Sequence, residues 1–250
     1  TEPAAGEYAS IIDAVAALGA DGGKVYVRPG TYEETMTTSN GVWLTTAVQV
    51  IGLTDDPTTV VVTRQTSYKS RIFTLNHKDA AIRFLTVTGG ELAAAMNGVT
   101  VEGNGGNVFV SSKGGTVENC ILKNGSTEPA WSAGGGNIAL FGGRMANCRL
   151  IGGKCRTTVG ANQWIQCGSS VFAKSTDASD VVIENCLITG AGLTTDKDGG
   201  APVGLYNNVR MVNCTVADSV GTRAGGVVLF KTAKGGTLPQ VVNCAFYNNR

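Results

Sequence analysis

The sequence predicts an all-β solenoid in which short parallel strands stack coil upon coil, and three observations indicate it. An Asn-Cys pair preceded by an apolar residue recurs five times, at Cys120, Cys148, Cys186, Cys214 and Cys244, with intervals of 28, 38, 28 and 30 residues. Pairs of apolar residues two apart precede each copy, and a single amphipathic helix opens the chain. A repeat of this length indicates stacked units, because no unit can bury its apolar face alone.

Each unit is predicted to bend at its asparagine. The residue two before Asn is apolar in every copy: Val117, Met145, Ile183, Met211 and Val241. The residue two after Cys is apolar as well: Leu122, Leu150, Ile188, Val216 and Phe246. Simple strand alternation would place these flanks on opposite faces, whereas a bend at Asn lets both point into one core.

The first strand of each unit shows period-2 apolar pairs. These are Val108/Val110, Ile138/Leu140, Val171/Ala173, Val203/Leu205 and Val227/Leu229. An earlier copy, Phe73/Leu75, fits the same frame with Leu85 at the cysteine position and Phe84 at the asparagine position. Equivalent positions in successive coils should then form columns with a spacing of about 4.8 Å.

Two such columns are predicted to be structural. The cysteines named above should form a column of small buried side chains. We expect Asn119, Asn147, Asn185, Asn213 and Asn243 to hydrogen-bond amide to amide along the axis, at a buried bend.

Composition excludes several partners and cofactors. A net charge of +1 does not favour nucleic acid, and no apolar run is long enough to span a membrane. With one histidine and no Cys-x-x-Cys motif, no metal site is indicated; we expect no cofactor, although calcium stays open. Cys155 and Cys167 lie in one long loop, where a disulfide would contribute about 3 kcal/mol; paired and unpaired states both stay open.

The two ends differ. A helix is predicted from Tyr8 to Leu18, within a cap segment 8–19 in which Ser10 and Asp13 form a capping pair. Residues 24–250 should form the coils, and residues 1–250 a single domain. The chain stops directly after a core strand. We therefore expect a longer parent chain, or end-to-end self-association through the uncapped last coil.

The opening carries a specific resemblance. The helix, the segment Gly23-Lys-Val-Tyr-Val-Arg-Pro-Gly-Thr-Tyr32 and the Asn-Cys strands together resemble the pectin-lyase-like superfamily, most of all pectin methylesterases and β-helix polysaccharide lyases. The resemblance implies a right-handed parallel β-helix of roughly eight coils, located outside the cell or at its surface. The motifs Asn-Thr-Asp, Gly-His-Gly and Arg-Ile-Lys of related enzymes are not found. Whether the chain is an enzyme, and then a polysaccharide lyase or a glycoside hydrolase, stays open.

The loops that leave each second strand are the predicted glycan site. They should cluster at one corner, where aromatic rings stack on sugars and charged groups meet carboxylates. The candidate substrate-binding residues are Trp131, Arg156, Trp164, Asp196, Asp198 and Arg223. In the alternative interpretation each tryptophan only anchors its own loop.

Two further side-chain columns are predicted to be structural. Glu118, Arg144, Glu184 and Arg210 alternate in charge just before the Asn bends, which favours a salt-bridge ladder over a catalytic carboxylate pair. Phe141, Lys174, Tyr206 and Phe230 follow the first strands and should pack on one another, with a carbohydrate groove as the alternative. The leading hypothesis is an exported protein that binds or cleaves polysaccharide on its loop face; the alternative is a non-catalytic surface or filament scaffold.

Overall fold

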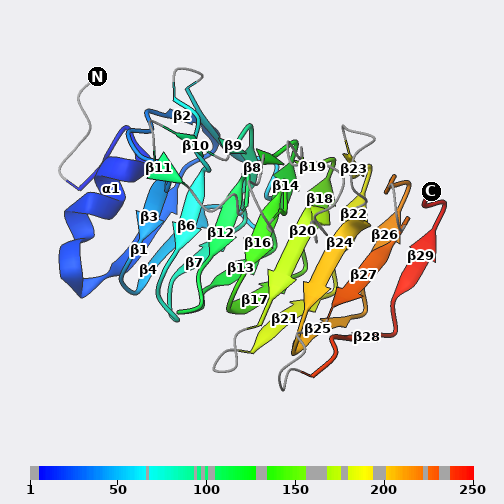
Figure 1. The fold of residues 1–250 in the computed structure, drawn as a ribbon. Coiled ribbons are helices and arrows are strands. Elements are labelled where there is room, and N and C mark those ends of the chain that lie inside the picture. The colour runs from blue at the N-terminus through cyan, green and yellow to red at the C-terminus, as the bar shows by residue number, and fades with distance from the viewer. Residues whose placement is uncertain are drawn as a thin grey trace.

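The chain winds into a stack of coils that supply strands to three long parallel sheets (Figure 1). The computed structural model describes residues 6–65, 68–92, 95–96, 99–100, 105–127, 134–155, 168–175, 180–193, 201–221, 225–230 and 237–250. Strand order within the sheets follows chain order, so each new coil is laid on the preceding one. The predicted all-β solenoid is confirmed.

Four parallel sheets and one hairpin contain all the strands of the described residues. Sheet A comprises β1 (Gly23–Val27), β4 (Val48–Gly52), β7 (Ala81–Arg83), β13 (Thr116–Glu118), β17 (Gly143–Ala146), β21 (Val181–Glu184), β25 (Val209–Val212) and β28 (Gln240–Val242). Sheet B comprises β2 (Gly30–Glu34), β5 (Val60–Arg64), β8 (Thr86–Thr88), β14 (Ile121–Lys123), β18 (Arg149–Ile151), β22 (Leu187–Thr189), β26 (Thr215–Ala217) and β29 (Ala245–Tyr247). Sheet C comprises β3 (Val42–Leu44), β6 (Phe73–Leu75), β12 (Val108–Val110), β16 (Ile138–Leu140), β20 (Gly168–Lys174), β24 (Ala201–Tyr206) and β27 (Val227–Phe230). The short sheet D comprises β9 (Glu91–Leu92), β15 (Ser126–Thr127), β19 (Lys154–Cys155) and β23 (Gly192–Leu193), and β10 (Ala95–Met96) pairs antiparallel with β11 (Val99–Thr100).

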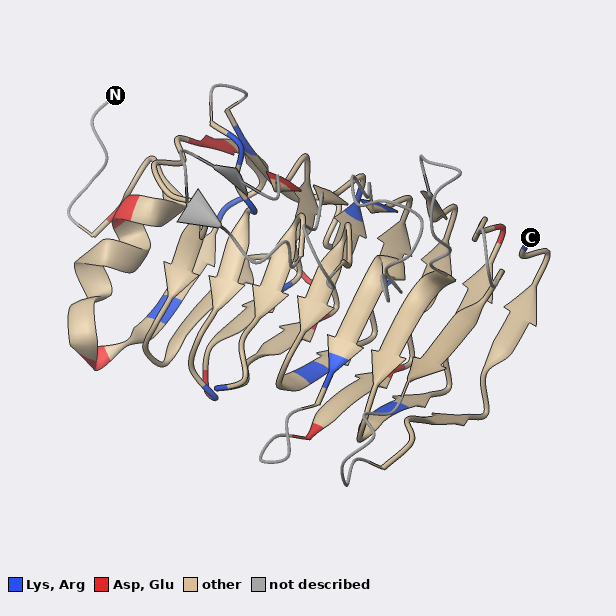
Figure 2. Cartoon of the chain, in the orientation of Figure 1, with Lys and Arg blue, Asp and Glu red and all other residues tan. Residues whose placement is uncertain are grey.

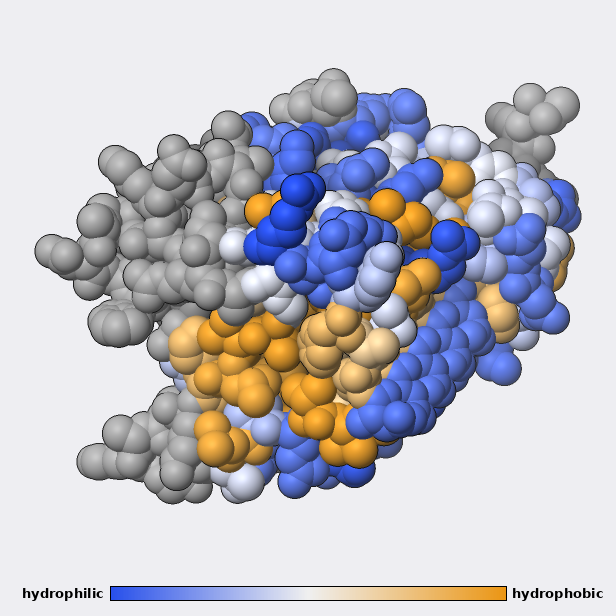
Figure 3. All heavy atoms as spheres, turned by 90° about the vertical axis from the view of Figure 1, so that its right-hand side faces the viewer, coloured by the Kyte–Doolittle hydropathy of each residue, from blue (hydrophilic) through white to orange (hydrophobic). Residues whose placement is uncertain are grey.

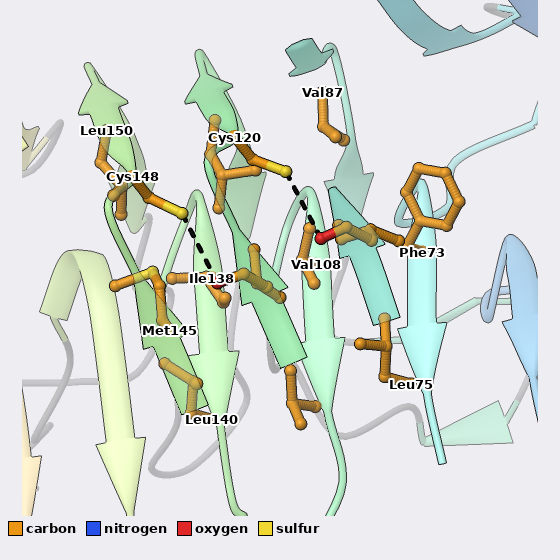
Figure 4. Packing of buried hydrophobic residues seen from close by; sticks show 14 of the residues in the cluster. Phe73, Leu75, Val87, Val108, Cys120, Ile138, Leu140, Met145, Cys148 and Leu150 are labelled. Carbon is orange, nitrogen blue, oxygen red and sulfur yellow. Dashed lines mark hydrogen bonds between the residues drawn. The ribbon is translucent and has the colours of Figure 1, made fainter. Parts of the chain in front are cut away.

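The interior is an apolar column built from equivalent positions of successive coils. Val108 pairs in register with Ile138, and Val117 with Met145, and all four side chains are buried. Cys120 lies in the same core, 1% exposed, and its Sγ donates to the Ile82 carbonyl oxygen of the preceding coil at 3.6 Å (Figure 4). Apolar residues at the predicted positions therefore meet across the coils and exclude water along the whole stack.

The bend between sheets A and B occurs at the predicted asparagines. All five adopt the left-handed conformation, with φ between 50° and 53°, which asparagine tolerates better than most residues. Phe84 has φ of 55° and takes the equivalent place in an earlier coil, as predicted. The expected burial was wrong: Asn119 is half-buried and the other four asparagines are exposed, because the left-handed turn directs them outward. One amide-to-amide bond joins Asn243 Nδ2 to Asn213 Oδ1 at 2.6 Å.

The N-terminal helix α1 (Ile11–Leu18) and the following 3₁₀ turn η1 (Gly19–Asp21) cover one end of the stack (Figure 1). The helix starts three residues later than predicted, because Ser10 is the N-cap and its Oγ accepts from the Asp13 N–H at 3.2 Å. Ile11 and Ala14 are buried, and the helix contacts β1, β2 and β3. It therefore closes the apolar interior at this end and covers the first strand of each long sheet.

Candidate functional site

A row of aromatic rings runs along the outer face of sheet C. We call it the aromatic strip, and it consists of Phe109, Phe141, Phe172, Tyr206 and Phe230. Successive ring centroids lie 5.3, 6.0, 6.4 and 5.3 Å apart. The rings pack on one another, as the sequence predicted for the column after the first strands.

Strand alternation and register produce the strip. Val108 and Val110 point into the core, so Phe109 between them points outward. Phe109 and Phe172 occupy equivalent positions and form one column. Lys174, Tyr206 and Phe230 are paired in a second column, two residues later in each strand. The strip therefore combines two adjacent columns of the same face.

Two cations lie against the strip. Lys174 Nζ is 6.0 Å from the ring centroids of both Phe141 and Tyr206, and the Arg71 guanidinium lies 4.8 Å from that of Phe109. Such a contact contributes about 0.5–1 kcal/mol at an exposed position and about 2 kcal/mol when desolvated. Lys174 is half-buried and Arg71 is 4% exposed, so the Arg71 contact is the desolvated one. Lys174 is the one charged residue in the seven strands of sheet C, whose ribbon in Figure 2 is otherwise almost free of charge colour.

The loops predicted to bind substrate begin and end beside this face. Loops after β15, β19 and β23 lead to β16, β20 and β24, and both sets of strands are stacked in parallel. The ends of these loops consequently lie one above another at the corner of sheets D and C. The six candidate residues Trp131, Arg156, Trp164, Asp196, Asp198 and Arg223 lie outside the described residues, so their roles stay predictions. The same holds for the Cys155–Cys167 disulfide: Cys155 is buried in β19, and Cys167 is outside the described part.

A buried polar ladder supports this corner, and sequence reasoning missed it. Asn107 Nδ2 donates to Asn137 Oδ1 at 3.1 Å, and Asn137 Nδ2 donates to Ser170 Oγ at 3.0 Å. All three residues are 0% exposed. The signal was a repeated Gly-Gly-Asn: Gly135 has φ of +78°, and a Cβ there would lie 2.0 Å from the Ile138 carbonyl oxygen. The amides satisfy backbone groups that the loops would otherwise leave unpaired.

The outer face of sheet A carries the predicted ion ladder, with a different register. Arg144 pairs with Thr116 across the sheet, two residues before Glu118, so the charges lie on a diagonal and do not form one column. Arg144 Nε donates to Glu184 Oε1 at 2.7 Å and Arg144 Nη1 donates to Glu118 Oε1 at 3.3 Å. Arg83 Nε donates to Glu118 Oε2 at 3.1 Å. Within the described residues Arg210 takes part in no ion pair.

These contacts set the protonation of the ladder. Partial burial raises the pKa of Glu118, but hydrogen bonds from Arg83 and Arg144, together with their charges, outweigh burial and lower it overall. The hydrogen bond and charge of Glu184 raise the pKa of Arg144. Glu118 is thus held ionised by the two arginines, as in a salt-bridge ladder and unlike a general acid, whose carboxyl must stay protonated.

The family of the chain follows from its sequence match. A family model described as a right handed beta helix region matches residues 84–250. The chain belongs to this family. The membership confirms the predicted right-handed parallel β-helix and the resemblance to the pectin-lyase-like superfamily at the level of fold.

Solved structures resemble this β-helix only distantly. The pectin methylesterase from Aspergillus niger in deglycosylated form is 14% identical, with a TM-score of 0.42 over 96% of this chain and 82% of that one. The A-module of the mannuronan C-5 epimerase AlgE4 from Azotobacter vinelandii is 11% identical, with a TM-score of 0.27 over 95% and 90%. With TM-scores below 0.5, neither likeness supports a statement about activity. The search among curated proteins finds no match.

Two further observations concern the described part of this β-helix. Its helices are too short to cross a membrane. No three His, Cys, Asp or Glu side chains among the described residues come together as metal ligands would.

Proposed function

We propose that this β-helix is an exported protein that binds polysaccharide along the aromatic strip and the adjoining loop corner, outside the cell or at its surface. The observation that carries the proposal is the strip itself, in which Lys174 sits between the rings of Phe141 and Tyr206. Aromatic faces stack on the apolar faces of sugar rings, and an ammonium group among them favours a sugar that bears a carboxylate. Cleavage of the bound chain, by elimination or by hydrolysis, would be carried out by side chains of the loops.

The length of the strip suits a polymer. The rings span five successive coils, from β12 to β27, and coils lie about 4.8 Å apart. Phe172 is buried, whereas the other four rings are half-buried. A linear polysaccharide lying parallel to the stack axis would therefore contact the rings on both sides of Phe172. Multiple weak contacts along one chain give useful affinity without an enclosed pocket.

The experiment measures binding and product formation together. The intact chain is titrated calorimetrically with a galacturonate hexasaccharide and with a neutral glucose hexasaccharide, while absorbance of unsaturated products and release of reducing ends are followed. Tyr206→Ala should weaken binding of the acidic sugar about tenfold, as loss of one stacking contact implies. Lys174→Met should remove the preference for the acidic over the neutral sugar.

Tyr247→Ala is the matched control, because Tyr247 is 72% exposed in β29 of sheet B, away from the strip. This variant should bind as the wild type does. Equal affinity in the wild type and the Tyr206→Ala variant would contradict the proposal, and products from either sugar would establish an enzyme.

The alternative function is that of a structural scaffold, which would associate through the end of the stack opposite α1. Figure 3 shows an apolar surface across this end, where Leu229, Val242 and Phe246 are 42%, 47% and 44% exposed. Because α1 covers the other end, contact through this surface would join two copies face to face and would not extend into a filament. A Val242→Lys change should keep the chain monomeric by light scattering if such contact occurs. A wild-type chain that is monomeric at high concentration would contradict the self-association.

A further inference from the structure

A second aromatic and basic surface lies at the N-terminal end of the molecule, where the segment that leads into α1 meets β1. A hollow of about 630 Å³ separates them. Its walls include Tyr8 and Ile11 on one side, Tyr26 and Arg28 on the other, and Tyr32 from the neighbouring sheet. The aromatic strip lies on sheet C and shares none of these residues.

The tyrosines of the hollow are presented to solvent. Tyr26 is 58% exposed and Tyr8 is 48% exposed, although both carry large apolar rings. Tyr32 is half-buried, and its hydroxyl donates to the Arg28 carbonyl oxygen at 3.0 Å, which fixes the ring against the end of β1. Tyrosine rings offer stacking surface at little cost in conformational freedom, because they have only two side-chain torsions.

Positive charge flanks Tyr26 along β1. Lys24, Tyr26 and Arg28 alternate with core-facing residues, so their side chains leave the same face at intervals of about 6.6 Å. The Arg28 guanidinium forms an ion pair with Glu7, which closes one rim of the hollow and leaves the remaining N–H donors of Arg28 for a ligand. Lys24 is exposed and takes part in no ion pair within the described residues.

The alternation of cation, ring and cation indicates the ligand. We propose that this hollow is a second binding site for an oligosaccharide that carries carboxylates, with one sugar ring stacked on Tyr26 and carboxylates bound by Lys24 and Arg28. An extended peptide that adds a strand to β1 fits less well, because α1 packs against β1 and covers its edge.

The test isolates this hollow from the aromatic strip. A galacturonate hexasaccharide is titrated into the intact chain carrying Lys174→Met and Tyr206→Ala, which removes the strip, and into the same background with Tyr26→Ala added. The backbone amide signals of β1 are followed by NMR during each titration. Tyr26→Ala should weaken the remaining binding about tenfold. Lys24→Met should reduce the preference of the hollow for the acidic over the neutral sugar.

The matched control is Tyr247→Ala in the same background, since Tyr247 is an exposed tyrosine in the strand at the other end of the stack. It should leave the remaining binding and the β1 signals unchanged. Binding that Tyr26→Ala leaves unaltered, or that a neutral glucose hexasaccharide matches, would overturn the proposal. If the strip binds no sugar, the wild type and the strip-deficient background will bind equally, so failure of the strip and failure of the hollow are distinguishable.

Discussion

The carboxylate of Glu34, at the end of β2, accepts a hydrogen bond of 2.8 Å from the backbone N–H of Ile11, the first residue of α1. Its second oxygen accepts from Ser10 Oγ at 2.9 Å and from the Ile12 N–H at 3.2 Å. A buried anion thus satisfies the free N–H groups and the positive dipole end of the helix. This bond network attaches the cap to the first coil.

Glu34→Gln should lower the free energy of unfolding by about 1–3 kcal/mol, because one accepting oxygen is replaced by a donor facing backbone N–H groups. Urea denaturation followed by circular dichroism measures the change. Glu33→Gln is the control, because Glu33 lies next to Glu34 in the same strand but is exposed. This variant should unfold as the wild type does. Equal effects of the two substitutions would show that the buried bonds do not stabilise the cap.

Arg144→Met should destabilise the coil stack by about 1 kcal/mol, since Glu118 and Glu184 lose their shared partner. Arg210→Met is the control, because Arg210 lies in the same column two coils further along and has no ion pair within the described residues. Its effect should stay within about 0.5 kcal/mol. Chemical denaturation at low salt measures both variants, and equal losses would argue against the ladder.

The contribution of this ladder should depend on pH. The pKa of Glu118 is lower in the folded chain than its ordinary value of 4.5, so the pair stabilises the fold above that value. The stability is lost as the pH falls through the folded pKa. The difference in unfolding free energy between the wild type and the Arg144→Met variant should therefore be full at pH 7 and shrink below about pH 4.5. A difference that stays constant down to pH 2 would contradict this assignment.

Asn119→Ala should cost about 1 kcal/mol, because alanine is strained at a φ of 52°. Asn119→Gly should cost much less, since glycine adopts this conformation without strain. The hydrogen bond from the Asn119 N–H to the Ala146 carbonyl oxygen is kept in both variants. Thermal unfolding compares them, and a similar loss in the two would mean that the amide side chain matters more than the backbone turn.

Cys148 should resist alkylation in the folded state, because burial raises the pKa of its thiol and its side chain is 1% exposed. Cys244, in the last coil, is half-buried and should be modified first among the five cysteines of the column. Iodoacetamide labelling at pH 8, read by peptide mass spectrometry with and without urea, tests the order. Labelling of Cys148 as fast as Cys244 without urea would contradict it.

Much of the fold could be predicted because it is local and repeated. The apolar residue two before each asparagine, the small cysteine and the apolar residue two beyond it define one inward-facing set, and the observed pairing of Val117 with Met145 has that register. The predicted equivalence of Phe84 and Leu85 to an Asn-Cys pair was also confirmed, since Ile82 pairs with Val117. The charges of the ion ladder were predicted to form a single column, but they occupy two columns. The sequence does not show which outward residue of the next coil lies nearest.

The repeat by itself determined the parallel stack, its apolar interior and the left-handed bend, because each depends on residue type at a fixed interval along the chain. Only the tertiary structure decided that Asn107 and Asn137 are the buried amides, that Glu34 holds the helix, and that five aromatic rings with Lys174 form one face. Those contacts join residues from different coils or from the cap. Their distances are set by how the coils and the helix pack, which no interval within one coil encodes.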